Sequence, residues 1–258
     1  MPLPEYKDID VNKYSRGRIK PFTIPLSSEY TFTMHINGTP YAEIACSGSG
    51  MEEFAIGHLL SNSIIRSNDD IREVVIDENG KEINIITGPN AKIPEKTLPV
   101  KFIASAGGKT RKGINSDLIN TILPIVKAST IIKIMDKFVN HSNLHDLTHG
   151  VHSSGLYSAD GEMLAFYDDI GRHNAVDKSL GFAIKNSINL HDKMIILTGR
   201  LASEIVYKAI NAGVPVIISR ASTTTRGFEL AVKHNIILIG RVRTNSFIIF
   251  NGKDNISC

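Results

Sequence analysis

Short apolar runs and helix-like segments alternate along residues 193–239, and this alternation constrains the fold more than any other feature of the sequence. Strands that are apolar throughout are typical of a parallel sheet covered on both faces by the helices that connect its strands. The expected elements are strands at Met194–Leu197, Val214–Ser219 and Ile236–Ile239, and helices at Leu201–Ala212 and Thr223–His234. The pattern therefore predicts an α/β fold built on a buried parallel sheet.

The first part of the chain has a different pattern, in which short β-type runs are separated by the Asn-Gly turns typical of hairpins. Residues 1–20 are polar and are expected to form a poorly fixed arm or an edge strand. The other expected elements are hairpins at Glu29–Ile36 with Tyr41–Ala45, Ile71–Ile76 with Glu82–Ile86 and Gly155–Ser158 with Met163–Tyr167, a strand at Leu98–Ile103, and helices from Met51 and over Asn115–Met135. We predict a smaller β-rich domain with one helix over residues 1–103 and an α/β domain over residues 104–258.

The chain has 258 residues, a formal net charge of +3 and only two cysteines, Cys46 and Cys258. Two cysteines exclude a disulfide scaffold and a cysteine-rich zinc or iron–sulfur site. The small charge excess gives no reason to expect nucleic-acid binding, and no apolar run approaches the ~20 residues of a membrane span. The first residues are charged and lack the apolar core of a signal peptide, so we expect a cytoplasmic protein with no membrane partner.

The turn at residues 169–178 holds the densest group of polar side chains in the sequence. It follows an expected strand and precedes an apolar helix, so its residues lie at a helix N-terminus, where backbone N–H groups favour anions. Its candidate binding residues are Asp169, Gly171, Arg172, His173, Asn174, Asp177 and Lys178. A capped helix with a surface ion pair is the alternative, but capping alone requires fewer polar groups, so we favour a binding site.

Arginines follow each of the three expected parallel strands. Arg200, Arg220 and the pair Arg241 and Arg243 come directly after them. Ligands of such sheets bind at the carboxyl ends of the strands, which share one edge. Several guanidinium groups at one edge, together with Arg172, favour a ligand with several negative charges. The alternative is that each arginine merely faces water.

Four histidines occur close together, at positions 141, 145, 149 and 152. This run could bind a metal ion, but no carboxylate completes a His-Glu-x-x-His pattern and Gly150 interrupts a helix. Histidines near a loop more often make polar contacts, so we expect no metal site. A nucleotide- or metal-dependent hydrolase that uses these histidines stays open as an alternative function.

The chain resembles the FdhD/NarQ family of formate dehydrogenase accessory sulfurtransferases over nearly its whole length. The segments that carry the resemblance are Met51–Ser61, Thr148–His152, Asp169–Lys178, Thr198–Ser203 and Ala212–Pro215, with a departure from the family pattern at His149. The resemblance implies a cytidine-deaminase-like three-layer αβα domain without the zinc ligands of a deaminase. It also implies a cytoplasmic protein that accepts sulfur from a cysteine desulfurase and passes it to the molybdenum bis(molybdopterin guanine dinucleotide) cofactor of formate dehydrogenase.

A cofactor with several phosphates and guanines suits the arginine-rich edge, and a guanine nucleotide serves as its surrogate. The resemblance places cofactor binding at the C-terminal stretch, where the family's second arginine is replaced by Ser246. Added to the helix-end turn, the predicted cofactor-binding residues are His152, Gly199, Arg200, Ser203, Arg241, Val242, Arg243, Thr244, Asn245 and Ser246. We expect a homodimer, because twofold dimers are the commonest assemblies.

The persulfide cysteines of the family are absent from this chain. Their loop matches residues 104–109, where Ala104 and Gly107 occupy the two cysteine positions. Sulfur relay requires a thiolate, and Cys46 and Cys258 are weak substitutes, since free cysteines are more often inert. The sulfurtransferase activity is therefore open, and the second alternative is a non-catalytic carrier or chaperone of the same cofactor.

Overall fold

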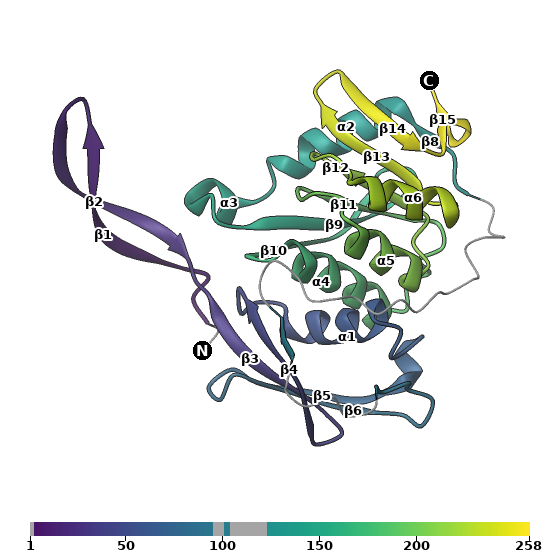
Figure 1. Ribbon diagram of the computed structural model, residues 1–258, viewed down its shortest axis with the longest axis horizontal. Helices are drawn as coiled ribbons and strands as arrows, with labels where there is room; N and C mark the ends of the chain where they lie inside the picture. Colours follow the sequence, from purple (N-terminus) through teal and green to yellow (C-terminus); the bar gives the residue numbers. More distant parts are fainter. Residues whose placement is uncertain (1–2, 95–100, 104–122) are drawn as a thin grey trace.

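The computed structural model describes residues 3–94, 101–103 and 123–258 of the chain (Figure 1). The predictions for Ala104, Gly107 and the first part of the helix expected at 115–135 lie outside these ranges. The helices are α1 Met51–Ser61, α2 Ala128–Val139, α3 Asn143–Thr148, α4 Arg172–Lys185, α5 Ser203–Ala212 and α6 Thr225–Lys233. The strands are β1 Tyr6–Ser15, β2 Arg18–Ser27, β3 Tyr30–Ile36, β4 Thr39–Cys46, β5 Ile71–Asp77, β6 Glu82–Thr87, β7 Lys101–Ile103, β8 Val126–Lys127, β9 His152–Ser158, β10 Met163–Asp169, β11 Lys193–Leu197, β12 Val216–Ser219, β13 Ile237–Arg243, β14 Ser246–Asn251 and β15 Ile256–Ser257. Within the described ranges, no helix is long and apolar enough to cross a membrane.

A six-stranded sheet in the order β10-β9-β11-β12-β13-β14 forms the centre of the C-terminal part. The three strands predicted as parallel are confirmed, with Met194 opposite Val216 and Ile217 opposite Leu238. The sheet as a whole is mixed, because β14 and the predicted hairpin of β9 and β10 pair antiparallel with their neighbours. Strands β10 and β14 each follow the preceding strand through a short turn, and such a connection reverses the chain direction. Strand β14 was not expected from the sequence.

Helices cover both faces of this sheet and confirm the predicted α/β fold. Side chains of one parallel strand alternate between two cores, so that Ile195 lies in one and Met194 and Ile196 lie in the other. The first core includes residues of α4 and α5, such as Leu180, and the second includes residues of α2, such as Phe138. The three layers are visible in Figure 1, with α2 on one side of the sheet and α4, α5 and α6 on the other.

Helix α2 begins at Ala128, so the prediction of a helix already at residues 123–127 is wrong. Pro124 lacks a backbone N–H and disfavours the helical conformation for the residue before it. Val126 and Lys127 instead form β8, which pairs in parallel with β15 at the C-terminus. Apolar residues keep a helical spacing through residues 123–127, but Pro124 prevents a helical backbone there.

A second sheet, in the order β5-β6-β3-β4-β7, packs against α1, and α1 packs against α4 (Figure 1). The two hairpins predicted in this part are confirmed as β3 with β4 and β5 with β6. Buried residues of the second sheet, such as Phe32, belong to the same hydrophobic core as Leu197 of the central sheet. The division at residue 103 stays a prediction, with one continuous core on both sides of it.

Two glycines allow α1 and α4 to cross in backbone contact. A Cβ atom on Gly57 would lie 1.8 Å from the carbonyl oxygen of Asp177, and one on Gly181 would lie 1.8 Å from that of Glu53. Neither distance is compatible with a side chain, so these positions require glycine at the present helix separation. The crossing holds the first turn of α4 at a defined place beside the N-terminal part of the chain.

Of the two expectations for residues 1–20, the edge strand is confirmed, since β1 and β2 form a ten-pair hairpin in a sheet of two strands. Its turn residues Arg16 and Gly17 both have positive φ, as the tight turn of a twisted hairpin requires. Among the described residues, its base is attached to the body where the Ser27 hydroxyl donates to the Thr148 hydroxyl over 2.7 Å. Ser28 N–H donates to the carbonyl of Glu5, which joins the two ends of the hairpin to each other. The rest of the hairpin projects away from the two sheets (Figure 1).

Candidate functional site

One edge of the central sheet collects the ends of five strands. The parallel strands β11, β12 and β13 all end there, and β9, antiparallel to β11, begins there with His152. Strand β10 returns to the same edge with Asp169, which lies opposite His152. The topology therefore brings the helix-end turn and all the arginine-bearing loops to one edge, as the sequence predicted for strands of a shared sheet.

Hydrogen bonds join the neighbouring segments at this edge of the sheet. The Ser219 hydroxyl donates to the carbonyl of Gly199 over 2.6 Å, and Arg243 Nη1 donates to the carbonyl of Arg220 over 2.7 Å. Gly199 lies directly on the side chain of Arg172, since a Cβ atom there would come within 2.9 Å of two Arg172 carbons. The loop after β11 thus packs on the first residue of α4.

Arg172 and His173, in the first turn of α4, hold buried polar atoms without a partner. Nε of Arg172 and both ring nitrogens of His173 have no hydrogen-bond partner among the described residues. Burial, together with the positive charges of Lys208 and Arg172, lowers the pKa of His173 to about 3. The imidazole is therefore neutral and offers one donor and one acceptor.

Arg200 lies close enough to affect the groups around it. Burial lowers the pKa of Arg172, and the charge of Arg200 acts in the same direction. Burial also lowers the pKa of His152, helped by the charges of Arg172, His145 and Arg200. Nearby like charges of this kind are typical of sites built for an anion, because a bound anion relieves their repulsion.

Asp169 and Lys178, also predicted as binding residues, form a fully buried internal ion pair. Both side chains have 0% exposure, and Lys178 Nζ lies 2.6 Å from Oδ2 of Asp169. Oδ1 of Asp169 accepts from Gly171 N–H at 2.8 Å and from the Asn174 amide at 2.9 Å, while Ser47 N–H and hydroxyl donate to Oδ2. These side chains link α4 to the end of β4.

Asp177 is the centre of a second buried network. Lys208 Nζ lies 2.7 Å from both of its oxygens, and the Ser61 hydroxyl donates to Oδ1 over 2.7 Å. Burial alone would raise the pKa of Asp177, but Lys208 and the hydrogen bond with Nδ1 of His58 outweigh it and lower the pKa to about 2. Asp177 therefore joins α1, α4 and α5 from inside the core.

Two groups of predicted residues can therefore be distinguished. Arg172 and His173 have buried atoms with no partner among the described residues. Four others have internal partners: Asp169, Asn174, Asp177 and Lys178. Ser47, His58, Ser61 and Lys208 were missed by sequence reasoning, because each lies in an ordinary helix or loop pattern and becomes notable only beside a distant carboxylate. Their binding partners lie between 31 and 122 residues away along the chain.

The C-terminal stretch predicted to bind the cofactor forms the turn between β13 and β14. The side chains of Arg241 and Arg243 are exposed, and so are Thr244, Asn245 and Ser246. Val242 is the exception, because its side chain is fully buried in the core under α2. Ser203 is half-buried at the start of α5, where its hydroxyl donates to Glu204 over 3.1 Å.

The two cysteines differ sharply in access. Cys46 is fully buried at the end of β4, with its Sγ 3.6 Å from Sδ of Met51. Burial raises the pKa of its thiol to about 12, and Asp169 raises it too. Cys258 is exposed. Because sulfur carriers react as thiolates, Cys46 lacks the properties of one.

The four histidines have different neighbours, although the rings of His145 and His149 lie 5.5 Å apart. His141 packs on Phe166 between α2 and α3, with ring centroids 4.5 Å apart, and Nδ1 of His145 lies 3.3 Å from the carbonyl of Val151. Across the described parts of the chain, no group of three or more His, Cys, Asp or Glu side chains is arranged to hold a metal ion.

We expect His173 to make the protein sensitive to mild acid. Its folded pKa of about 3 lies below the 6.5 of an unfolded histidine, so the unfolded chain binds a proton first as the pH falls. Stability from the neutral ring is complete above pH 6.5 and is lost towards pH 3, by about 1.4 kcal/mol per pH unit. Urea unfolding of the wild type and His173→Gln between pH 7 and pH 5 measures the difference in slope, and equal slopes would refute the assignment.

Comparison with known proteins places these features in a family. The model of the FdhD/NarQ family matches residues 27–257. Proteins named "Sulfur carrier protein FdhD" are 30% identical to the chain in Bacillus licheniformis and 32% identical in Geobacillus kaustophilus, and the matches cover 95% of this chain and 94% and 95% of those proteins. A crystal structure of a protein from Desulfotalea psychrophila, described as a candidate formate dehydrogenase accessory protein, has the same fold, with a TM-score of 0.80, 22% identity and coverage of 98% of this chain and 100% of the other. The chain with the arginine-rich sheet edge described above belongs to the FdhD/NarQ family.

Proposed function

We propose that this protein is an accessory factor in the maturation of a formate dehydrogenase, and that it binds the molybdenum bis(molybdopterin guanine dinucleotide) cofactor as cargo. The names of its relatives, sulfur carrier and candidate formate dehydrogenase accessory protein, support the role. We further propose that it works in the cytoplasm as a homodimer and receives sulfur from a cysteine desulfurase.

The single observation that carries cargo binding is the group of unpartnered buried atoms in the first turn of α4. Nε of Arg172 and the ring nitrogens of His173 lack partners among the described residues, at a helix end that favours anions. Arg200 and Arg220 follow β11 and β12 at the same edge, and Arg241 and Arg243 lie at the end of β13. A dinucleotide with several phosphates supplies the acceptors that these donors need.

Replacement of Arg172 by Ala is expected to weaken guanine-nucleotide binding. The lost contact is charge-assisted and partly buried, so the loss of binding free energy is about 1.5–3 kcal/mol, and Arg243→Ala is expected to lose a similar amount. Isothermal titration with GDP measures both. Arg72→Ala is the matched control, because Arg72 is exposed on β5 of the second sheet, away from the arginine-rich edge. Wild-type affinity in both edge variants would refute the site.

Sulfur delivery by this chain requires a thiol that it presents to the donor. The family's cysteine positions, Ala104 and Gly107, lie outside the described residues and hold no thiol in any conformation. Cys46 is buried with a raised pKa, which leaves Cys258 as the accessible thiol. Binding of the cofactor is therefore supported more directly than relay of sulfur, and a carrier without its own persulfide is the second version of the function.

We expect no persulfide on Cys46 after incubation of the protein with a cysteine desulfurase and cysteine. A persulfide adds one sulfur, about 32 Da, to the thiol that carries it. Peptide mass analysis of the wild type and of Cys258→Ser distinguishes the two versions. An adduct on Cys258 of the wild type that disappears in Cys258→Ser supports sulfur relay. If the wild type carries no adduct, the result supports a cofactor carrier without its own persulfide. An adduct on Cys46 would contradict the burial argument.

A further inference from the structure

The projecting β1–β2 hairpin has two faces of different chemistry. Cross-strand partners share a face of an antiparallel pair, so the register assigns every side chain to one face or the other. One face holds Lys7, Ile9, Val11, Lys13 and Ser15 of β1 with Arg18, Lys20, Phe22, Ile24 and Leu26 of β2. The other holds Tyr6, Asp8, Asp10, Asn12 and Tyr14 with Ile19, Pro21, Thr23, Pro25 and Ser27. The first face, called here the basic–apolar face, has four cations and no carboxylate.

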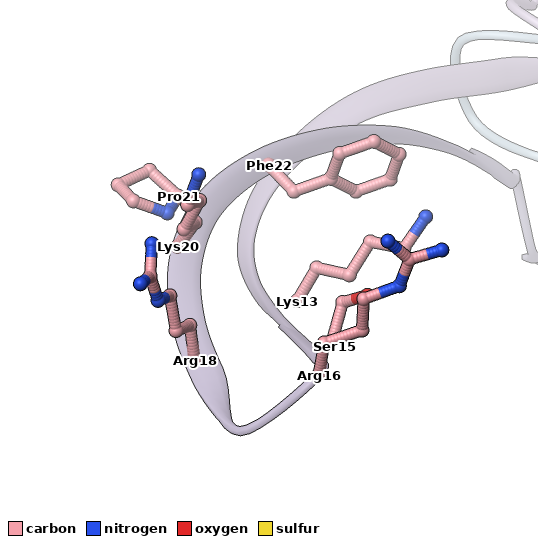
Figure 2. A pocket seen from close by; sticks show the side chains of 7 residues that line it. All are labelled: Lys13, Ser15, Arg16, Arg18, Lys20, Pro21 and Phe22. Carbon is pink, nitrogen blue, oxygen red and sulfur yellow. The ribbon is translucent and has the colours of Figure 1, made fainter.

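The basic–apolar face is hollowed near the hairpin tip. A cavity of about 530 Å³ lies there, lined by Lys13, Arg16, Arg18, Lys20 and Phe22 together with Ser15 and Pro21 (Figure 2). Nζ of Lys13 lies 4.7 Å from the centre of the Phe22 ring. Figure 2 shows Phe22, Lys13 and Arg16 inside the curl of the ribbon. The cationic ends of Lys13 and Arg16 thus lie on the same side of the ribbon as the Phe22 ring, which is 42% exposed.

The two free edges of the hairpin are protected against addition of another strand. Pro21 and Pro25 lie four residues apart on β2 and have no N–H to donate at its edge. Asp8 and Asp10 stand on β1. Prolines and charges on an edge are the usual means by which proteins prevent edge-to-edge pairing. A partner is therefore expected to cover the face of the hairpin rather than extend its sheet.

The exposed apolar side chains of the basic–apolar face are typical of a surface that another molecule buries. A two-stranded hairpin alone in water is only marginally stable, and Ile9, Val11, Phe22 and Leu26 expose between 37% and 43% of their surface on one side. The opposite face also exposes Tyr6, Tyr14 and Ile19, so it is the cations, rather than apolar exposure, that distinguish the basic–apolar face. Contiguous exposed apolar side chains with a polar rim mark interaction surfaces. The strip of four apolar residues beside the cations favours a protein over a nucleic acid, whose phosphates would leave that strip in water.

The base of the hairpin lies next to the functional edge of the sheet. Ser27 bonds to Thr148, and a Cβ atom on Gly150 would come within 2.7 Å of the Ser27 hydroxyl. Two residues later, His152 begins β9 at the edge. Figure 1 shows the hairpin projecting from the side of the molecule on which β10 ends. A macromolecule held by the hairpin is thereby brought close to the arginine-rich loops.

We propose that the basic–apolar face is a docking surface for a protein whose contact region carries carboxylates around an apolar centre, and that this protein is the formate dehydrogenase that receives the cargo. The identity of the partner rests on the proposed function, whereas the chemistry of the contact rests on the hairpin alone. Attraction between the hairpin cations and the carboxylates of the partner increases the association rate. Burial of Phe22 and its apolar neighbours stabilises the complex.

The test measures the Kd between this protein and purified formate dehydrogenase from the same organism, prepared without its pterin cofactor. Lys13→Ala with Lys20→Ala is expected to weaken binding about tenfold, and Phe22→Ala about tenfold as well. Lys13→Arg with Lys20→Arg keeps the charge and is expected to restore wild-type affinity. The matched controls are Arg72→Ala with Lys253→Ala, which removes the same charge from exposed positions of the body, and Tyr14→Ala, which removes an aromatic ring from the opposite face. Both controls are expected to bind as the wild type.

Each other outcome overturns the proposal. Unchanged affinity in the lysine and phenylalanine variants would show that the hairpin is not the contact. Tight binding of a duplex of about 20 base pairs, lost in the lysine variant, would make it a nucleic-acid surface. Dissociation of a dimer in the Phe22 variant, seen by sedimentation, would assign the face to a second copy of the chain. GDP titration of the same variants is expected to be unchanged, so failure of cargo binding is distinguished from failure of docking.

Discussion

Asp177→Asn is expected to lower the free energy of unfolding by about 3–5 kcal/mol, because it leaves the ammonium of Lys208 buried without a counter-charge. Lys208 is 3% exposed and Asp177 is 1% exposed, so water cannot replace the lost partner. Urea unfolding near pH 7, followed by circular dichroism, measures the change. Lys185→Ala is the control, since Lys185 forms a surface pair with Glu52 and Glu53 and is expected to lose only about 0–1 kcal/mol.

Replacing both members of this pair separates the charge from the packing. Asp177→Leu with Lys208→Met is expected to recover most of the stability lost in the single variant, because a buried ion pair is often replaced by apolar side chains at little net cost. A double variant as unstable as Asp177→Asn would show that the bonds from Ser61 and His58, rather than Lys208, dominate the network.

Gly57→Ala and Gly181→Ala are each expected to destabilise the protein by about 3 kcal/mol or more, at or above the upper end of ordinary overpacking. In both cases the new methyl group would lie 1.8 Å from a backbone carbonyl oxygen, which cannot rotate away as a side chain can. The helices must separate, and the first turn of α4 moves with them. We therefore expect weaker GDP binding as well as a lower urea midpoint.

Gly88→Ala is the matched control for the two crossing glycines. The nearest atom to its added Cβ would be 3.5 Å away, an ordinary contact, and its φ is not in the left-handed region. Its stability is expected to stay within about 0.5 kcal/mol of the wild type. If Gly57→Ala and Gly181→Ala were as mild as this control, α1 and α4 could not be in backbone contact.

The helices and strands of the C-terminal part could be predicted because their signals are local. Apolar periodicity and flanking turn residues defined the elements that became α5, β12 and α6, with errors of one or two residues at their ends. The error at Pro124 arose where apolar spacing and backbone chemistry disagreed. Strand β14 was missed because the turn that joins it to β13, Thr244 and Asn245, carries no strong turn signal.

Local sequence patterns were sufficient to predict an α/β sheet with several arginines at one edge, because strand direction follows from the alternation of strands and helices. The three-dimensional packing was needed to separate the polar side chains of segment 169–178 that have internal partners from those that keep unpartnered buried atoms in the described structure. Asp169 and Asp177 meet lysines, serines and a histidine up to 122 residues away along the chain, whereas Arg172 and His173 keep buried atoms that meet no partner in the described structure. Local sequence cannot separate these two groups, since the burial and partners of a helix residue depend on distant segments that pack against it.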